Sequence, residues 1–223
     1  MDSNPWLHIP LEDYERHMSH HLVGQSTLLN SLTKKYLDET KPETVIFLGI
    51  AGGNGLEHID NKITQSVYGI DINQDYLDTA FKRFKNTIPS LQLVNLDITQ
   101  HSESICKADF IWAALVLEYT GIDKALSFCA NNMQKEGQLV FSIQSNNNKQ
   151  SISPTGIESV KKAGEIFSIV EPEALLSKAA ENGLRLIGKE ENILPNGKSI
   201  ITFHFVAAEI NHVQSHDYIY YKA

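Results

Sequence analysis

The sequence lacks the features that mark membrane-spanning, secreted and disulfide-rich proteins. Its 223 residues contain no apolar run near the roughly 18 residues that span a bilayer. The first ten residues, MDSNPWLHIP, have neither the basic nor the apolar region of a signal peptide. The two cysteines, Cys106 and Cys129, form no C-x-x-C spacing and no disulfide framework. We therefore expect a cytoplasmic protein whose thiols are reduced.

Positive charge is also scarce. Lysine and arginine number 19 against 27 acidic residues, and the formal net charge is −8. A nucleic-acid-binding protein normally carries a basic stripe that neutralises phosphates, and none is visible here. This balance argues against nucleic acid and anionic membrane as the main partner and favours a small-molecule substrate. It does not indicate an oligomeric state.

Hydrophobic periodicity predicts alternating strands and helices. Such alternation is typical of a doubly wound α/β fold, here with a mostly parallel, seven-stranded sheet. The turn signal Pro195-Asn196-Gly197 predicts that the last two strands pair as an antiparallel hairpin. The expected strands are 44–48, 66–70, 91–96, 108–117, 138–144, 184–191 and 199–207. The expected helices are 11–40, 73–86, 122–133 and 172–181.

The stretch VIFLGIAGGNGLEHI (residues 45–59) joins the first strand to a glycine-rich loop. Glycine tolerates the dihedral angles of a loop whose backbone closely approaches a ligand or a neighbouring helix. Asp71 ends the next strand, where a carboxylate can accept hydrogen bonds from ribose hydroxyls. Neither G-x-G-x-x-G nor a phosphate-binding Gly-Lys-Ser/Thr is present. The loop therefore favours a nucleoside cofactor without a pyrophosphate.

Four pieces in order resemble the class I S-adenosylmethionine-dependent methyltransferases over about residues 43–144. They are the glycine loop, Gly69-Ile70-Asp71-Ile72, the strand end Asn95-Leu96-Asp97-Ile98 with the apolar strand after it, and the segment from Glu136 to Phe141. The resemblance implies one methyltransferase domain over residues 1–223. Residues 1–40 would form an N-terminal helical lid, residues 43–144 the cofactor-binding core, and residues 145–223 the C-terminal helices and hairpin.

The resemblance also assigns cofactor-binding positions. Asp71 would bind the ribose hydroxyls and Asp97 the adenine amino group. The full set is Gly49, Ala51, Gly53, Asn54, Asp71, Ile72, Asp97 and Ile98. The family commonly has an acid and a glycine where this chain has Phe47 and Ala51, so either the cofactor binds more weakly or Asn54 compensates. Purely structural alternatives stay open: both acids could cap local structure, and the glycines could serve only tight packing.

Methyl transfer needs mainly in-line placement of the acceptor, so the sequence singles out no general base. The candidate catalytic residues are Tyr14 and His17, as lid residues, and Glu118, as a substrate contact or a helix-start carboxylate. His17, His20 and His21 share helical spacing, but no carboxylate or cysteine pattern completes a metal site, and we expect none. The motif Asn/Asp-Pro-Pro-Tyr is absent. In the family, nucleic-acid and protein amide methylases use this motif to bind a planar amino group.

Three functions are compatible with these patterns. The leading interpretation is a methyltransferase that uses S-adenosylmethionine and acts on a small-molecule acceptor. An alternative is a catalytically silent nucleoside-cofactor-binding protein that serves as a sensor or partner subunit. An NAD-linked reductase is disfavoured because both frames of the glycine loop lack the third glycine.

Overall fold

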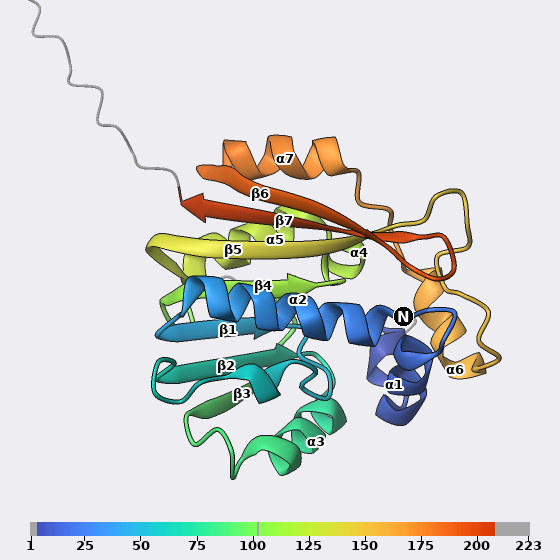
Figure 1. The fold of residues 1–223 in the computed structure, drawn as a ribbon, viewed down its shortest axis with the longest axis horizontal. Coiled ribbons are helices and arrows are strands. Elements are labelled where there is room, and N and C mark those ends of the chain that lie inside the picture. The colour runs from blue at the N-terminus through green and yellow to red at the C-terminus, as the bar shows by residue number, and fades with distance from the viewer. Residues whose placement is uncertain (1–3, 102, 208–223) are drawn as a thin grey trace, which may run out of the picture.

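The core of the computed structural model is a seven-stranded sheet (Figure 1). The structure describes residues 4–101 and 103–207. The strand order is β3-β2-β1-β4-β5-β7-β6. Strands β1 to β5 run parallel, and β7 pairs antiparallel with both β5 and β6. The strands are β1 (Thr44–Leu48), β2 (Ser66–Asp71), β3 (Leu91–Asn95), β4 (Ala108–Ala114), β5 (Met133–Ser145), β6 (Leu184–Ile193) and β7 (Ser199–Ala207).

Helices cover both faces of the sheet, and further helices lie at the carboxyl ends of its parallel strands. Figure 1 shows α1 and α6 together at the end toward which the arrowheads of β1, β2 and β4 point. In the described part of the chain, no helix combines the length and apolarity needed to cross a bilayer. The α-helices are α1 (Leu11–Ser19), α2 (Gln25–Thr40), α3 (Gln74–Phe84), α4 (Leu117–Thr120), α5 (Ile122–Asn132), α6 (Glu158–Lys161) and α7 (Pro172–Glu181). In the described residues, the 3₁₀ helices are η1 (Pro5–Leu7), η2 (Leu56–His58) and η3 (Lys162–Glu165).

Strand β1 shows how the two cores form. Successive side chains of a strand point to opposite faces. Val45 and Phe47 join the core beneath α2 and α3, whereas Ile46 and Leu48 join the core beneath α5 and α7. All four are at most 3% exposed. An apolar strand buried on both faces is typical of a parallel sheet. Because β1 lies between β2 and β4, the loop after β1 lies in the middle of the row of carboxyl strand ends.

The structure confirms the predicted sheet and hairpin, the helix Pro172–Glu181, and Asn73 as the N-cap of α3. Three predicted boundaries were wrong by more than two residues, and one of them is the start of β5, expected at residue 138 but found at Met133. The helix expected over 11–40 is interrupted between Ser19 and Gln25, where Gly24 adopts φ 67° and lies against Pro195. The strand expected over 108–117 ends at Ala114, because Leu115 adopts φ 57° and α4 begins two residues later.

Gly53 combines a positive φ of 89° with a tight contact. A Cβ built on this residue would lie 2.6 Å from the ring of Phe84 on α3. Gly156 is a matched control, because its φ is 78° and no atom lies within 4 Å of its built Cβ. Both alanine variants incur the left-handed backbone strain, about 1–2 kcal/mol. We expect Gly53→Ala to cost a further ~1–3 kcal/mol for overpacking, measured by urea unfolding. Equal losses in the two variants would show that Phe84 moves aside freely.

Candidate active site

A cavity of about 190 Å³, here the first cavity, lies at the carboxyl ends of four neighbouring strands. The loop after each of β1, β2, β3 and β4 contributes to its wall. In an open α/β sheet, ligands bind in the crevice outside these strand ends, where the strand order reverses. The wall residues from the four loops include Gly49, Ala51, Asp71, Ile72, Asp97, Ile98, Leu115 and Val116.

The loop after β1 is held tightly against its neighbours. The N–H of Gly49 donates to the carbonyl of Ile70 at 2.9 Å, and a Cβ on Gly49 would lie 2.7 Å from Val116. Ala51 adopts φ 47°, the left-handed region that few side chains enter. Its N–H donates to Asp71 Oδ2 at 2.9 Å, which fixes this unusual conformation. The loop backbone therefore forms part of the cavity wall itself.

Asp71 connects this loop to α3. Its Oδ1 accepts the N–H of Asn73 at 2.9 Å, while Oδ2 accepts from Ala51. Burial raises the pKa of the Asp71 carboxyl, and the N–H groups of Asn73, Ala51 and Ile72 oppose this shift. A carboxylate offers about four lone-pair sites, so acceptor capacity remains for a ligand in the first cavity. Capping and ligand binding are thus compatible at this residue.

Asp97 has one oxygen occupied by local structure. Its Oδ1 accepts the N–H of Thr99 at 2.9 Å and the hydroxyl of Thr99 at 2.7 Å. Capping of a following helix, the alternative role for Asp97, does not occur, because residues 98–100 make only a turn. No hydrogen bond to Asp97 Oδ2 is found among the described residues. One carboxylate oxygen on the cavity wall is therefore left for a ligand.

The N-terminal segment covers the first cavity with aromatic side chains. Trp6 makes edge contacts with Tyr14 at 5.7 Å and with Tyr119 at 5.0 Å between ring centroids. Two hydrogen bonds tie the segment to α3: Asn73 Nδ2 donates to the carbonyl of Trp6, and the Tyr76 hydroxyl donates to that of Ile9, both at 2.8 Å. Trp6 Nε1 is buried without a partner among the described residues.

Tyr14 stays protonated in this environment. Burial, together with the charges of Asp71 and Glu15, raises the pKa of its hydroxyl well above the ordinary value. Its ring stacks on Tyr76 with centroids 6.2 Å apart. Tyr14 can therefore act as a wall and a hydrogen-bond group, but not as a base near neutral pH.

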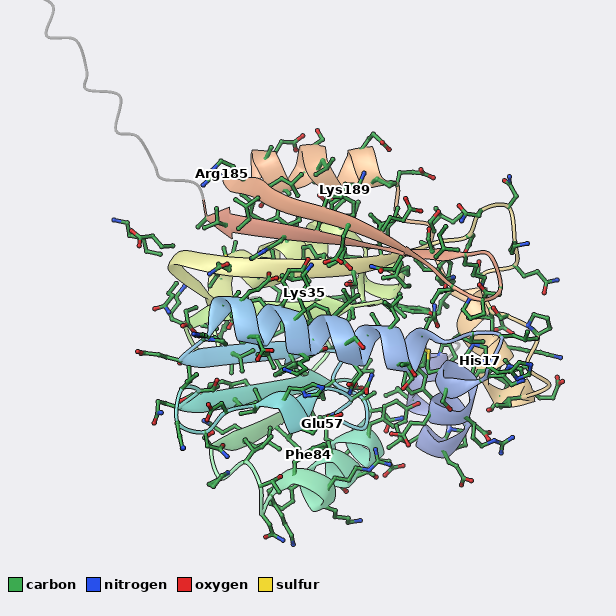
Figure 2. All side chains as sticks on the ribbon, in the orientation of Figure 1. His17, Lys35, Glu57, Phe84, Arg185 and Lys189 are labelled. Atoms are coloured by element: carbon green, nitrogen blue, oxygen red, sulfur yellow. The ribbon has the colours of Figure 1, made fainter. Side chains whose placement is uncertain are left out.

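A second cavity, of about 60 Å³, adjoins the first. The two share the side chains of Trp6, Tyr14, Leu115 and Tyr119. His17 lies on the wall of the second cavity only, and its Nδ1 is 2.8 Å from the Thr155 hydroxyl. Figure 2 shows His17 where α1 meets the segment around α6. Among the described residues, no group of three or more His, Cys, Asp or Glu side chains is placed to hold a metal ion.

A third cavity, of about 520 Å³, is lined by residues 50–54 of the glycine loop, which include the remaining two predicted cofactor positions, Gly53 and Asn54. Gly53 contacts Phe84, as the packing alternative expected. Asn54 accepts from Asn30 Nδ2 and donates to the carbonyl of Ser26, both at 3.0 Å. Six of the eight predicted positions thus line the first cavity, and these two do not.

Glu118, expected as either a substrate contact or a helix-start carboxylate, lies in the first turn of α4 and does not line any of the three cavities. It is 1% exposed, its Oε1 accepts the N–H of Gln144 at 2.7 Å, and its Oε2 has no partner among the described residues. Burial raises the pKa of its carboxyl to about 7. The side chain acts here as a buried anchor between α4 and β5.

The raised pKa of the Glu118 carboxyl predicts that this residue makes the stability of the protein depend on pH. With a folded pKa of about 7 against an ordinary 4.5, the folded state retains a proton that the unfolded chain releases. The contribution of Glu118 to the free energy of unfolding should therefore fall as pH rises from about 4.5 to 7, whereas the lowered pKa of His17 gives a contribution of opposite sign from about pH 4 to 6.5. Glu118→Gln should remove this contribution, so the free energy of unfolding of the variant minus that of the wild type should be more favourable at pH 8 than at pH 5 by on the order of 2–3 kcal/mol. Urea unfolding at both pH values measures it.

Glu173→Gln, at an exposed glutamate in the first turn of α7, controls for the lost negative charge. It should leave the pH profile of the wild type unchanged. If the free energy of unfolding depends on pH in the same way in Glu118→Gln and Glu173→Gln, the Glu118 carboxylate is ionised in the folded protein at low cost.

Several wall residues were not found from the sequence. Trp6 lies outside the motif region, and Tyr76 belonged to an ordinary helical pattern. Lys198 follows the hairpin turn, 181 positions from His17 on the wall of the same cavity. No local signal could have paired them, because only the tertiary fold brings the hairpin turn beside α1.

The comparisons with known proteins agree with this fold. Residues 47–141 match the family described as "Methyltransferase domain". No curated protein matches the chain by sequence.

Many solved structures share the fold. The N-methyltransferase NodS from Bradyrhizobium japonicum WM9, in complex with S-adenosyl-L-homocysteine, is similar with a TM-score of 0.66 at 16% identity, covering 93% of this chain and 100% of that one. Magnesium protoporphyrin IX methyltransferase from Synechocystis PCC 6803 gives 0.66 at 15% identity, with 91% and 96% covered. Geranyl diphosphate C-methyltransferase from Streptomyces coelicolor A3(2) gives 0.63 at 10% identity, with 84% of each covered.

Proposed function

Because the chain carries a methyltransferase domain and has the fold of the class I S-adenosylmethionine-dependent methyltransferases, we propose that it transfers a methyl group to a small-molecule acceptor bound in the second cavity. The observation that carries this proposal is the shared wall of Trp6, Tyr14, Leu115 and Tyr119. A cofactor cavity and an acceptor cavity must meet where the methyl group passes between them. The relatives named above act on chemically different substrates, so the acceptor is argued from this chain alone.

The first cavity fits S-adenosylmethionine by the chemistry of its wall. Asp71 keeps acceptor capacity for the two ribose hydroxyls, and Asp97 keeps one free oxygen for the adenine amino group. Ile72 and Ile98, which also line this cavity, would supply apolar surface for that base. Gly49 and Ala51 bring backbone rather than side chains to the cavity. Gly53 and Asn54 would act only indirectly, by fixing the loop against α3 and α2.

The second cavity contains the groups that would orient an acceptor. When bound, S-adenosylmethionine supplies a methyl group on a positively charged sulfur, which takes the bonding electron pair as the acceptor atom forms its bond to carbon. In-line placement supplies much of the rate of such a transfer. Burial, then the charges of Lys198 and His20, lowers the pKa of His17 to about 4, so its imidazole is neutral near pH 7 and can accept a hydrogen bond. Tyr14 and Trp6 exclude water from the shared wall.

The location of the protein and the class of its substrate are also part of the proposal. A cytoplasmic location is supported by two free cysteines, one of them fully buried. A small molecule, rather than nucleic acid or a membrane, is supported by the net charge of −8 and by the small second cavity.

Binding of the cofactor is the first test. We expect S-adenosylmethionine and S-adenosylhomocysteine to raise the melting temperature, and NADH to leave it unchanged. Stabilisation should follow mass action, about 2.7 kcal/mol at a hundredfold excess over the dissociation constant. Transfer of a labelled methyl group to small molecules of a deproteinised extract then tests catalysis. Binding without any transfer would support the silent binding protein instead.

Asp71 should dominate recognition of the ribose. Asp71→Asn is expected to weaken S-adenosylhomocysteine binding by roughly 1.5–3 kcal/mol, the range for hydrogen bonds to a charged group, or about 10–150-fold. Asp75→Asn removes the same charge from the exposed first turn of α3 and should bind as the wild type does. Isothermal titration calorimetry measures both. An unchanged dissociation constant for Asp71→Asn would leave Asp71 with only its structural bonds to Ala51 and Asn73.

A further inference from the structure

The second cavity is mostly apolar but has one cationic group at its edge. Ile152, Val160, Ala163 and Phe167 form much of its wall, together with the aromatic residues shared with the first cavity. Lys198, the residue after the hairpin turn, also lines it. Ligand cavities of this kind fix the orientation of a molecule by a few polar groups set in an apolar wall. The polar groups therefore indicate the chemistry of the acceptor.

Lys198 is a buried cation without a counterion. Its side chain is 2% exposed, and Nζ donates to the carbonyl of Ser151 at 2.6 Å. An ammonium group has three donors, so this bond uses one of them. No carboxylate of the described residues lies within salt-bridge distance of Lys198. A buried charge is costly unless it is paired, and burial lowers the pKa of this ammonium to about 8.

The other polar groups of the cavity are neutral. The side-chain amides of Gln25 and Gln144 bond to each other at 2.6 Å, and Gln144 Nε2 also donates to Asn146 and to the carbonyl of Ser151. His17 is neutral near pH 7, as argued above. Glu118 reaches this network only through the backbone of Gln144 and does not line the cavity. The cavity therefore carries a single positive charge, which a monoanion would neutralise.

The position of Lys198 separates the anchoring group from the reacting atom. Lys198 lines the second cavity but not the first, whereas Trp6, Tyr14, Leu115 and Tyr119 line both. A group bound at Lys198 thus lies away from the shared wall. The atom that receives the methyl group must lie at that wall, so the two ends of the acceptor have different roles.

We propose that the acceptor is a small carboxylic acid whose carboxylate binds the Lys198 ammonium while its apolar body extends to the shared aromatic wall. This inference rests on the proposed function and specifies its substrate class. The carboxylate is an anchor and not the methylated group. A volume of about 60 Å³ restricts the acceptor to a small molecule.

The test uses the full chain saturated with S-adenosylhomocysteine and matched pairs of acid and primary amide: propionate and propionamide, benzoate and benzamide, phenylacetate and phenylacetamide. Calorimetry and thermal shift measure binding. We expect at least one acid to bind at least tenfold more tightly than its amide. Lys198→Met should lose that preference by a similar factor while its affinity for S-adenosylhomocysteine is kept.

Lys149→Met is the matched control, because Lys149 is an exposed lysine beside the same hairpin turn. It should bind the acid as the wild type does. Amides that bind as tightly as acids, no binding of any acid, or unchanged acid binding by Lys198→Met would each overturn the inference. If Lys198→Met does not fold, the comparison of acids with amides on the wild type still decides. Failure of the wild type to bind S-adenosylhomocysteine would count against the proposed function instead.

Discussion

The carboxylate of Asp71 is the interaction on which the site depends. It stands at the end of β2 and accepts backbone N–H groups from the glycine loop and from the start of α3, both at 2.9 Å. Charged hydrogen bonds of this kind are stronger than neutral ones. They hold Ala51 in a left-handed conformation that costs about 1–2 kcal/mol for a non-glycine residue. The strand end, the loop and the helix thereby form one rigid wall before any ligand arrives.

The sequence predicted those parts of the molecule that depend on local pattern. Buried parallel strands, a capped helix and a Pro-Asn-Gly turn each have a signal within about fifteen residues, so the sheet and its hairpin could be read directly. Six of the eight expected cofactor positions line one cavity because they all follow strand ends, and parallel strand ends meet at one edge. The break at Gly24 was missed, since a helical apolar pattern continues on both sides of it.

The second cavity could not be predicted because it depends on tertiary contacts alone. His17 was a candidate from the sequence, but Gln144 and Lys198 come from β5 and the end of the hairpin turn, and neither has a neighbour in sequence that signals its role. The turns themselves are joined across the fold, since Gly24 lies against Pro195 and Asn196 Nδ2 donates to Ser153 at 3.1 Å. A lysine after a turn is usually solvated, and its burial appears only once these segments are assembled.

Phe47, which stands where the methyltransferases that this chain resembles commonly have an acid, has a physical consequence. Phe47 is 3% exposed in the core beneath α2, with Trp112 beside it on β4, so the family's carboxylate is replaced by apolar packing. Asn54 was the alternative source of polar contact, but both ends of its amide are bonded to α2. The carboxylates near this loop are also engaged, Glu15 by Arg83 and Glu57 by Asn30 and the N–H of Gly55. These contacts favour weaker cofactor binding over compensation, because any group that turned toward the cofactor would first have to break a bond that stabilises the fold.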